Sequence, residues 1–299
     1  MRKLVENRTF DEERALYNLV DGDVIGCTFG GPADGESVLK EVRDVTVHDC
    51  AFHLRYPLWH ANRFTLAHST MDEKTRAPLW YTADGRIEDC DIRGIKCLRE
   101  CDRTIIERCQ IVSPEFGWKC RGVTVKDSEI TSEYLFLECR DMELQNFRMH
   151  GKYSFQYVEN VVIRDSILDT KDAFWHAKNV TVIHSTVRGE YLAWFSDGLT
   201  LIDCHIVGTQ PLCYCKNLRL ENCTMEGADL SFEYSDVAAT VNGHIDSVKN
   251  PRSGSITADS IGEIIRDDTL EEVRGLPASN AHCGIFIRGN GNSGENAIV

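Results

Sequence analysis

The sequence predicts an all-β protein, a single-stranded parallel β-helix with about 11 to 12 coils of 19 residues. Two observations lead to this prediction. Similar segments begin at residues 82, 101, 120, 139, 158, 177, 196 and 215, which are seven steps of 19 residues. Each segment opens with apolar residues at alternate positions, as a strand with one buried face does. The period is too short, and the units too rich in strand-forming residues, for repeats of helical hairpins.

Residues 1–18 are expected to form an N-terminal cap. Thr9-Phe10-Asp11-Glu12 has the pattern of a helix capping box, so one or two helical turns are predicted over residues 13–19. Such a helix would cover the first coil, whose open strand edges would otherwise invite pairing with another chain.

The coils are predicted to run from residue 19 to about residue 265. In each unit the apolar spacing changes from two residues to three, which places a bend between two strands, and the closing segment supplies a third strand. Residue types that tolerate positive φ stand two residues into most units. They are Asp44, Asp84, Gly122, Asp141, Asn160, Asn179, Gly198 and Asn217.

Residues 266–299 are expected to be a C-terminal extension. Residues 284–288 have the composition of a short strand that could cover a surface or pair with another subunit, with disorder as the alternative. The last segment, residues 289–299, has the composition of a flexible tail.

Cysteine and tryptophan positions indicate which residues face the interior. Ten of the 13 Cys fall in two columns, the first position of a unit (Cys101, Cys120, Cys139, Cys215) and the ninth (Cys27, Cys50, Cys90, Cys109, Cys204, Cys223). All five Trp stand two residues before a unit start, which in an extended strand is the same side as the first position. We therefore expect both sets inside, with Cys as a small core residue. Arg99 falls in the Trp column and would need a carboxylate partner there.

The same alternation predicts an apolar row on the outside. Three residues before the unit starts stand Leu58, Leu79, Leu98, Gly117, Phe136, Phe155, Phe174, Ala193 and Leu212. An exposed row this apolar would be unusual for a soluble monomer.

The outward column one residue before each unit start carries the predicted catalytic residues. It reads His60, Tyr81, Glu100, Lys119, Glu138, Tyr157 and His176, an order that is palindromic about Lys119. Glu100 and Glu138 lie two coils apart, so their backbones are expected about 9.6 Å apart. This is near the carboxyl separation of about 6.5–9.5 Å in inverting glycosidases. Lys119, Glu100 and Glu138 are therefore the catalytic candidates.

Two chemistries and one structural role are compatible with this triplet. A lysine between two carboxylates favours their ionised forms, which disfavours the protonated acid that a glycosidase needs. Lys119 could instead abstract a proton α to a carboxylate, as in polysaccharide lyases, while Tyr81 or Tyr157 protonates the leaving oxygen. The structural alternative is an exposed ladder of cross-strand ion pairs.

Further side chains near the triplet are predicted to bind substrate. They are His60, Tyr81, Arg99, Tyr157, His176, Lys152 and Asp172. A long outward groove that mixes aromatic and ionisable groups is suited to a chain of sugars. Neither a metal-ligand spacing nor a dinucleotide or phosphate-loop motif is found, so we expect no metal and no cofactor.

Composition excludes several classes of partner. The chain has 33 Lys and Arg against 47 Asp and Glu, a net charge of −14, which opposes binding to nucleic acid or an anionic membrane. It lacks an apolar run long enough to span a bilayer, and its first residues lack the apolar core of a signal peptide. The protein is therefore expected to be cytoplasmic, with its thiols free.

Several motifs resemble a known family. GPADGES, LRYPLWH, SPEFGWK, KYSFQYVEN, LDTKDAFWHAKNVTV, GTQPLCYC and SVKNPRSG follow one another between about residues 10 and 268. In this order they resemble a bacterial family, a domain of unknown function, within the pectin-lyase-like superfamily. The resemblance implies a right-handed β-helix, and superfamily relatives are mostly polysaccharide lyases and hydrolases. The clustered aspartates of polygalacturonases and the calcium-binding cluster of pectate lyases are missing, so no catalytic residue is implied.

Two functions from different classes follow from this sequence. The first is a carbohydrate-active protein that binds or cleaves an oligosaccharide, or binds another small molecule, in an outward groove of the β-helix. The alternative is a non-catalytic scaffold or binding protein whose apolar outer row is covered by a partner or, in a homodimer, by a second copy.

Overall fold

The structure is a computed structural model that describes residues 2–267 and 283–288. Every regular element in these residues is a β-strand, and the fold is a right-handed parallel β-helix, as predicted. The chain divides into two compact units, residues 1–151 and 152–299, which together hold about 14 coils. The prediction of 11 to 12 coils was too low, because segments before residue 19 and after residue 265 also form strands of the β-helix. The described residues contain no helix with the length and apolar character needed to cross a membrane.

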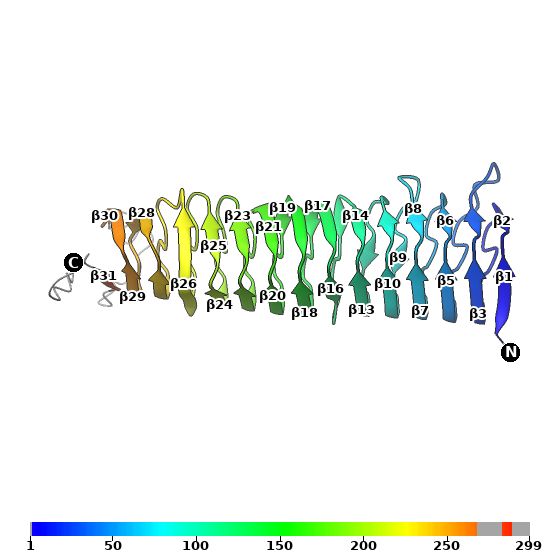
Figure 1. Cartoon of the computed structure of the whole chain (residues 1–299), viewed down its shortest axis with the longest axis horizontal. Coiled ribbons are helices and arrows are strands. Elements are labelled where there is room, and N and C mark those ends of the chain that lie inside the picture. The colour runs from blue at the N-terminus through cyan, green and yellow to red at the C-terminus, as the bar shows by residue number, and fades with distance from the viewer. Residues whose placement is uncertain (1, 268–282, 289–299) are drawn as a thin grey trace, which may run out of the picture. The chain divides into compact units, whose positions relative to one another are not determined.

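In the first unit, long strands stack in parallel, one from each coil (Figure 1). They are β3 (Val20–Ile25), β5 (Arg43–His48), β7 (Asn62–Ala67), β10 (Ala83–Glu88), β13 (Asp102–Glu107), β16 (Thr124–Lys126) and β18 (Arg140–Gln145). A bend leads from each long strand to a second strand. These are β4 (Thr28–Phe29), β6 (Ala51–Phe52), β8 (Thr70–Met71), β11 (Asp91–Ile92), β14 (Gln110–Val112) and β17 (Glu129–Leu135).

A third strand forms in only part of the first unit. It is present as β9 (Leu79–Trp80), β12 (Leu98–Arg99) and β15 (Glu115–Phe116). The closing segment of several other coils is a series of turns, so the prediction of three strands in each coil holds for only some coils. Successive coils keep the predicted register, since Gly85 pairs with Thr104 in the next coil.

The predicted helix over residues 13–19 is wrong. Residues 13–17 form turns, and the segment before them is already a coil with strands β1 (Lys3–Glu6) and β2 (Thr9–Phe10). β1 pairs in parallel with β3, and β2 pairs with β4. The ladder bonds and the burial of Phe10 against Phe29, with ring centroids 5.6 Å apart, therefore override the local capping pattern.

Charged residues protect the first coil in place of a helix. The Cζ of Arg8 lies 4.6 Å from the ring centroid of Phe10, and Arg2 bonds Asp23 at 2.7 Å. Lys3 and Glu6 stand on β1 itself, which is one strand further out than β3. Charged side chains on an edge strand discourage pairing with another chain.

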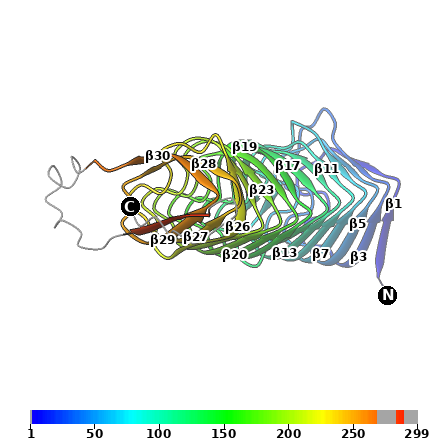
Figure 2. The ribbon, with the colours of Figure 1, turned by 60° about the vertical axis from the view of Figure 1, so that its left-hand side comes forward.

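The second unit repeats the same arrangement. Its long strands are β20 (Glu159–Arg164), β22 (Lys178–Ile183), β24 (Asp197–Ile202), β26 (Leu218–Glu226), β27 (Asp236–Val241) and β29 (Ser253–Ala258). Its second strands are β21 (Ile167–Lys171), β23 (Thr186–Arg188), β25 (His205–Val207), β28 (His244–Lys249) and β30 (Ser260–Ile265), while β19 (Arg148–Ser154) contains the boundary between the units. The predicted strand near residue 284 forms as β31 (Cys283–Ile287) and pairs with β29 of the same chain (Figure 2). The flexible tail predicted for residues 289–299 lies outside the described residues.

The cysteine columns lie in the interior, as predicted. All 13 cysteines are buried and reduced. In the ninth column, the sulfur or hydroxyl of one coil accepts a hydrogen bond from the backbone of the preceding coil, as Cys50 Sγ does from Cys27 and Ser69 Oγ from Cys50. Cys and Ser therefore serve the same structural purpose in this column.

The predicted orientation of the Trp column and of the apolar row is wrong, and the two are exchanged. The apolar row is fully buried, whereas all five Trp are only half-buried. The residue between the Trp column and each unit start has positive φ, from 51° at Glu100 to 62° at Phe195. This bends the backbone, so the two residues beside it face opposite sides, and an alternation that assumes an extended chain fails there.

This correction removes the basis of the oligomer alternative. Leu58, Leu79 and Phe136 are each 0% exposed, so the row proposed as an interface is part of the core. The turn residues two positions into each unit do have the positive φ predicted for them, between 51° and 75°.

Candidate functional site

The three catalytic candidates share one exposed column of the first unit. Their positive φ values place them at the bend that follows the closing segment of each coil. Lys119 Nζ lies 3.8 Å from Glu138 Oε2, and each side chain is about half exposed. Glu100 lies on the other side of Lys119 in the column but pairs with Arg99, whose Nε is 3.3 Å from Oε1. The structure therefore brings Lys119 and Glu138 together and gives Glu100 a different partner.

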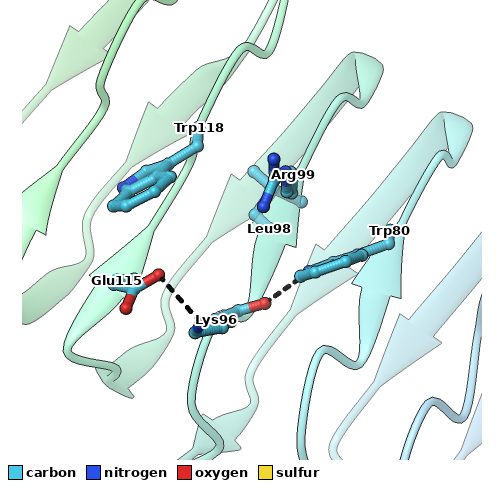
Figure 3. Close-up of a pocket in the computed structure, with 6 residues that line it drawn as sticks. All are labelled: Trp80, Lys96, Leu98, Arg99, Glu115 and Trp118. Carbon is cyan, nitrogen blue, oxygen red and sulfur yellow. Dashed lines mark hydrogen bonds and ion pairs between the residues drawn. The ribbon is translucent and has the colours of Figure 1, made fainter.

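A small pocket opens beside this column (Figure 3). It has room for about one water molecule, and it is lined by Trp80, Lys96, Leu98, Arg99, Glu115 and Trp118. Lys96 Nζ lies 3.7 Å from Glu115 Oε2, while the indole of Trp80 donates to the carbonyl of Lys96 at 2.6 Å. The pocket thus has two aromatic walls and a set of opposite charges.

Arg99 occupies the centre of this pocket, where the bend at Glu100 leaves its side chain partly exposed and Glu100 supplies a carboxylate partner. Its Cζ lies 4.9 Å from the ring centroid of Trp80 and 6.0 Å from that of Trp118. The backbone pairs Arg99 with Trp80 on one side and Trp118 on the other, so the guanidinium fills the place that an indole has in the neighbouring coils. A guanidinium stacks on aromatic faces and keeps its edge for hydrogen bonds, which suits an outward position.

The other two predicted residues of the first unit form an aromatic pair. The rings of His60 and Tyr81 are stacked with centroids 5.0 Å apart, and both side chains are exposed. One column away, Trp59 and Trp80 stack at 5.5 Å. Tyr81 stands one coil before Glu100, so the aromatic pair leads directly to the charged triplet.

In the second unit the same column forms an aromatic strip. Tyr157, His176, Phe195, Tyr214 and Tyr234 stack in sequence, with centroids 4.9 to 6.0 Å apart. Tyr157 and His176 were predicted for the site, whereas Tyr234 was missed because the period changes near residue 235. Rings stacked on one another offer mainly their edges to solvent, and a free ring face occurs only where the series is interrupted.

Lys152 and Asp172 also belong to the second unit but differ in environment. Lys152 is exposed, and its carbonyl accepts a hydrogen bond from Thr170 at 2.6 Å. Asp172 is only 7% exposed. Burial raises the pKa of the Asp172 carboxyl, the charge of Lys171 lowers it, and the charge of Glu190 raises it further. Lys171 itself pairs with Glu190 at 2.9 Å.

Several residues of these sites were missed by the sequence prediction. Trp80 and Trp118 were expected in the core, and Glu190 and Tyr191 were not singled out. The signal was present in the Trp column, because Arg99 and Gln156 interrupt it and polar residues are rare in a core.

The charged side chains do not gather into a metal site. Among residues 2–267 and 283–288, no three His, Cys, Asp or Glu side chains come close enough to share an ion. Burial raises the pKa of Cys50 and Cys215 to about 11, so these thiols are poor ligands and nucleophiles.

Solved structures with a similar solenoid have low sequence identity. PfbA, a surface adhesin of Streptococcus pneumoniae, is 8% identical with a TM-score of 0.40, over 95% of this chain and 82% of the adhesin. AlgG, a periplasmic alginate epimerase, is 10% identical with a TM-score of 0.31, over 83% of this chain and 76% of the epimerase. The catalytic domain of a GH87 α-1,3-glucanase in complex with nigerose is 10% identical with a TM-score of 0.24, over 97% of this chain and 64% of the glucanase domain.

These similarities concern the fold alone, and no curated protein matches the sequence. Residues 3–275, which cover most of the chain, match the family described as "Protein of unknown function (DUF3737)". The chain belongs to this DUF3737 family, in agreement with the resemblance in its sequence motifs.

Proposed function

We propose that the protein binds an oligosaccharide in the pocket between Trp80 and Trp118. The observation that carries the proposal is the interruption of the outer Trp column by Arg99. Trp80 and Trp118 belong to the two coils on either side of Arg99. The side of each indole that faces Arg99 meets its guanidinium and not another ring. Aromatic walls combined with a few convergent polar groups are typical of ligand sites.

The size and charge of the pocket support a sugar chain as the ligand. The pocket is a shallow hollow with room for about one water molecule, so it would contact the edge of one ring of a longer molecule without enclosing it. The nearby charges balance, with Lys96, Arg99 and Lys119 against Glu100, Glu115 and Glu138. A neutral or weakly charged sugar therefore fits better than a polyanion, which the net charge of −14 also repels.

Calorimetric titration tests this proposal. The ligands are a panel of neutral and uronate oligosaccharides, and the variants are Arg99→Ala and Trp118→Ala. We expect each to weaken binding at least tenfold. Arg121→Ala is the matched control, because this arginine is 73% exposed in its side chain, pairs with Asp141 at 2.9 Å and does not line the pocket. The proposal fails if wild type binds no member of the panel or if the pocket variants bind like wild type.

Cleavage of a weakly charged sugar that contains a uronate is the second part of the proposal, with Lys119 as the base and Tyr81 as the acid. Glu138 pairs with Lys119, and Glu100 pairs with Arg99. Lys119 is exposed and paired over 3.8 Å, which leaves it free to turn toward a ligand. With a uronate bound, Lys119 Nζ would act as the base that takes the proton α to the carboxylate. The electron pair would form a C=C bond as the glycosidic C–O bond breaks, and Tyr81 would protonate the departing oxygen.

A further inference from the structure

Gln156 is the first residue of the outer Trp column in the second unit, where it takes the place of an indole next to Trp175. Each indole of this unit donates to a carbonyl of the next coil, Trp175 to Tyr191 at 2.7 Å and Trp194 to Gln210 at 2.8 Å. Gln156 donates in the same way through its amide to the carbonyl of Asp172, at 3.5 Å. Gln156 therefore stands in the indole position but is much smaller than an indole.

The replacement of an indole by Gln156 leaves one face of Trp175 without an aromatic neighbour. Trp194 stacks on Trp175 with centroids 5.5 Å apart and an interplanar angle of 3°. The opposite face is turned toward the coil of Gln156, and in the described part of the chain no ring stacks on it. An indole face that is half-buried and free of ring contacts is a platform for a flat, partly apolar ligand.

Asp172 stands next to this platform. In neighbouring coils the residue at the same position packs against the indole three residues later, as Tyr191 does with Trp194 at 5.3 Å and Tyr56 with Trp59 at 4.7 Å. Asp172 occupies this position relative to Trp175, three residues before it.

The Asp172 carboxyl also has an unused hydrogen-bonding atom. The side chain is 7% exposed, and Oδ1 is buried with no hydrogen-bond partner among the described residues. Lys171 does not form an ion pair with the Asp172 carboxylate. Its ammonium pairs with Glu190 at 2.9 Å and lies 5.4 Å from the ring centroid of Tyr191. An unpartnered buried polar atom destabilises the folded protein, a penalty that a bound donor would remove.

We propose that Asp172 and Trp175 form a second carbohydrate site, which takes a neutral pyranose. The sugar ring stacks on the free face of Trp175, and one of its hydroxyl groups donates a hydrogen bond to Asp172 Oδ1. An anionic sugar is repelled by Asp172 and Glu190, whose charges outweigh that of Lys171. A neutral ring with hydroxyl donors satisfies both the indole and the carboxylate.

The environment of Asp172 gives this site a characteristic pH dependence. Burial raises the pKa of Asp172, the charge of Lys171 lowers it, and that of Glu190 raises it again. The hydroxyl bonds the ionised carboxylate, so protonation weakens binding. Affinity is therefore expected to fall as the pH drops through the raised pKa, above the ordinary value of about 3.9 for aspartate.

Titration with neutral methyl glycosides of glucose, galactose and mannose, and with their linear oligosaccharides, tests the site. Tryptophan fluorescence and calorimetry are the measurements. We expect Asp172→Asn to bind at least tenfold more weakly and without the pH dependence, and Trp175→Ala to lose binding. Asp165→Asn, at an exposed aspartate 3.6 Å from His184, should bind these sugars as wild type does.

Thermal unfolding separates a binding role from a structural one. Asp172→Asn keeps the shape of the side chain and removes a buried charge, so its melting temperature should equal or exceed that of wild type. The proposal is overturned if wild type binds none of the neutral sugars, or if Asp172→Asn binds them like wild type while melting higher. Affinity lost in Trp118→Ala is assigned to the first pocket and affinity lost in Trp175→Ala to this site, so either site can fail while the other stands.

Discussion

The guanidinium of Arg99 lies over the indole of Trp80, with its Cζ 4.9 Å from the ring centroid. This contact shows that the Trp column is a surface stack in which an arginine replaces a ring. It also explains how a charged residue stands in a column of indoles without a buried carboxylate. The outer face of the coils is therefore aromatic and charged, while the apolar row fills the core.

Tryptophan fluorescence will report this orientation. All five indoles are half-buried on the outer face, so iodide should quench a substantial part of the emission of the native protein. N-acetyltryptophanamide is the fully exposed reference. Blue-shifted emission that resists iodide would place the Trp column in the core and contradict the structure.

Core truncation should show that the apolar row is buried. Phe174 is 0% exposed and stacks on Phe155 at 5.1 Å, so Phe174→Ala should lower the free energy of unfolding by about 3–5 kcal/mol. Ile167 in the same unit is 40% exposed, and Ile167→Ala should change the free energy of unfolding by about 0.5 kcal/mol or less. Urea denaturation measures both, and equal losses in the two variants would argue against a buried phenylalanine row.

The sequence period predicts the β-helix because every coil must present the same pattern to its neighbours. Side-chain direction could be predicted only where the backbone is extended. Cys50 and Cys109 follow a long strand and were placed correctly inside, whereas Trp118 lies just before the positive φ of Lys119 and was placed on the wrong side. Positive φ is common for Asn, Asp and Gly, but His60 and Phe195 adopt it as well, and their residue types gave no sign of it.

Replacement of Lys119 tests the catalytic part of the proposal. If the protein is a lyase, Lys119→Ala should lower turnover of uronate oligosaccharides about 100-fold or more, since a positioned base contributes about 10²–10⁴-fold. Formation of the unsaturated product is followed by ultraviolet absorbance. Arg121→Ala should retain activity. Equal turnover by Lys119→Ala and wild type would leave Lys119 and Glu138 as an ion pair only.

The candidate site was only partly predictable. The exposed column with Glu100, Lys119 and Glu138 follows from the period alone, since side chains at one position repeat from coil to coil. The pocket depends on which side the indoles face, and this is decided by the bend at each coil. Asp172 was noted for its charge, but its burial arises from packing against other coils and could not be read from its position.

The cysteines should be unreactive in the native protein. All 13 are buried, and burial raises the pKa of Cys50 and Cys215 to about 11. Iodoacetamide near pH 8 should therefore modify few thiols before unfolding and all 13 in guanidinium chloride, as counted by mass spectrometry. Rapid alkylation of one thiol in the folded protein would identify a reactive cysteine and contradict a purely structural role.

Ion pairs between coils should make stability sensitive to acid. Arg103 bonds Asp84 at 2.6 Å and Arg108 bonds Asp89 at 2.8 Å, and these bonds hold the pKa of both carboxyls below the usual value. Their contribution is complete above the unfolded pKa of about 3.9 and is lost as the pH falls through the lower folded values. Asp84→Asn should therefore show a smaller loss of melting temperature below pH 4 than wild type. An identical acid profile would exclude this contribution.

A crystal structure with the tightest-binding oligosaccharide of the panel tests the central claim most directly. The account predicts a sugar ring in the pocket, in contact with Arg99 and with the indole of Trp80 or Trp118. Density for the sugar away from both the Arg99 pocket and Trp175, or an unchanged affinity in Arg99→Ala, would contradict it.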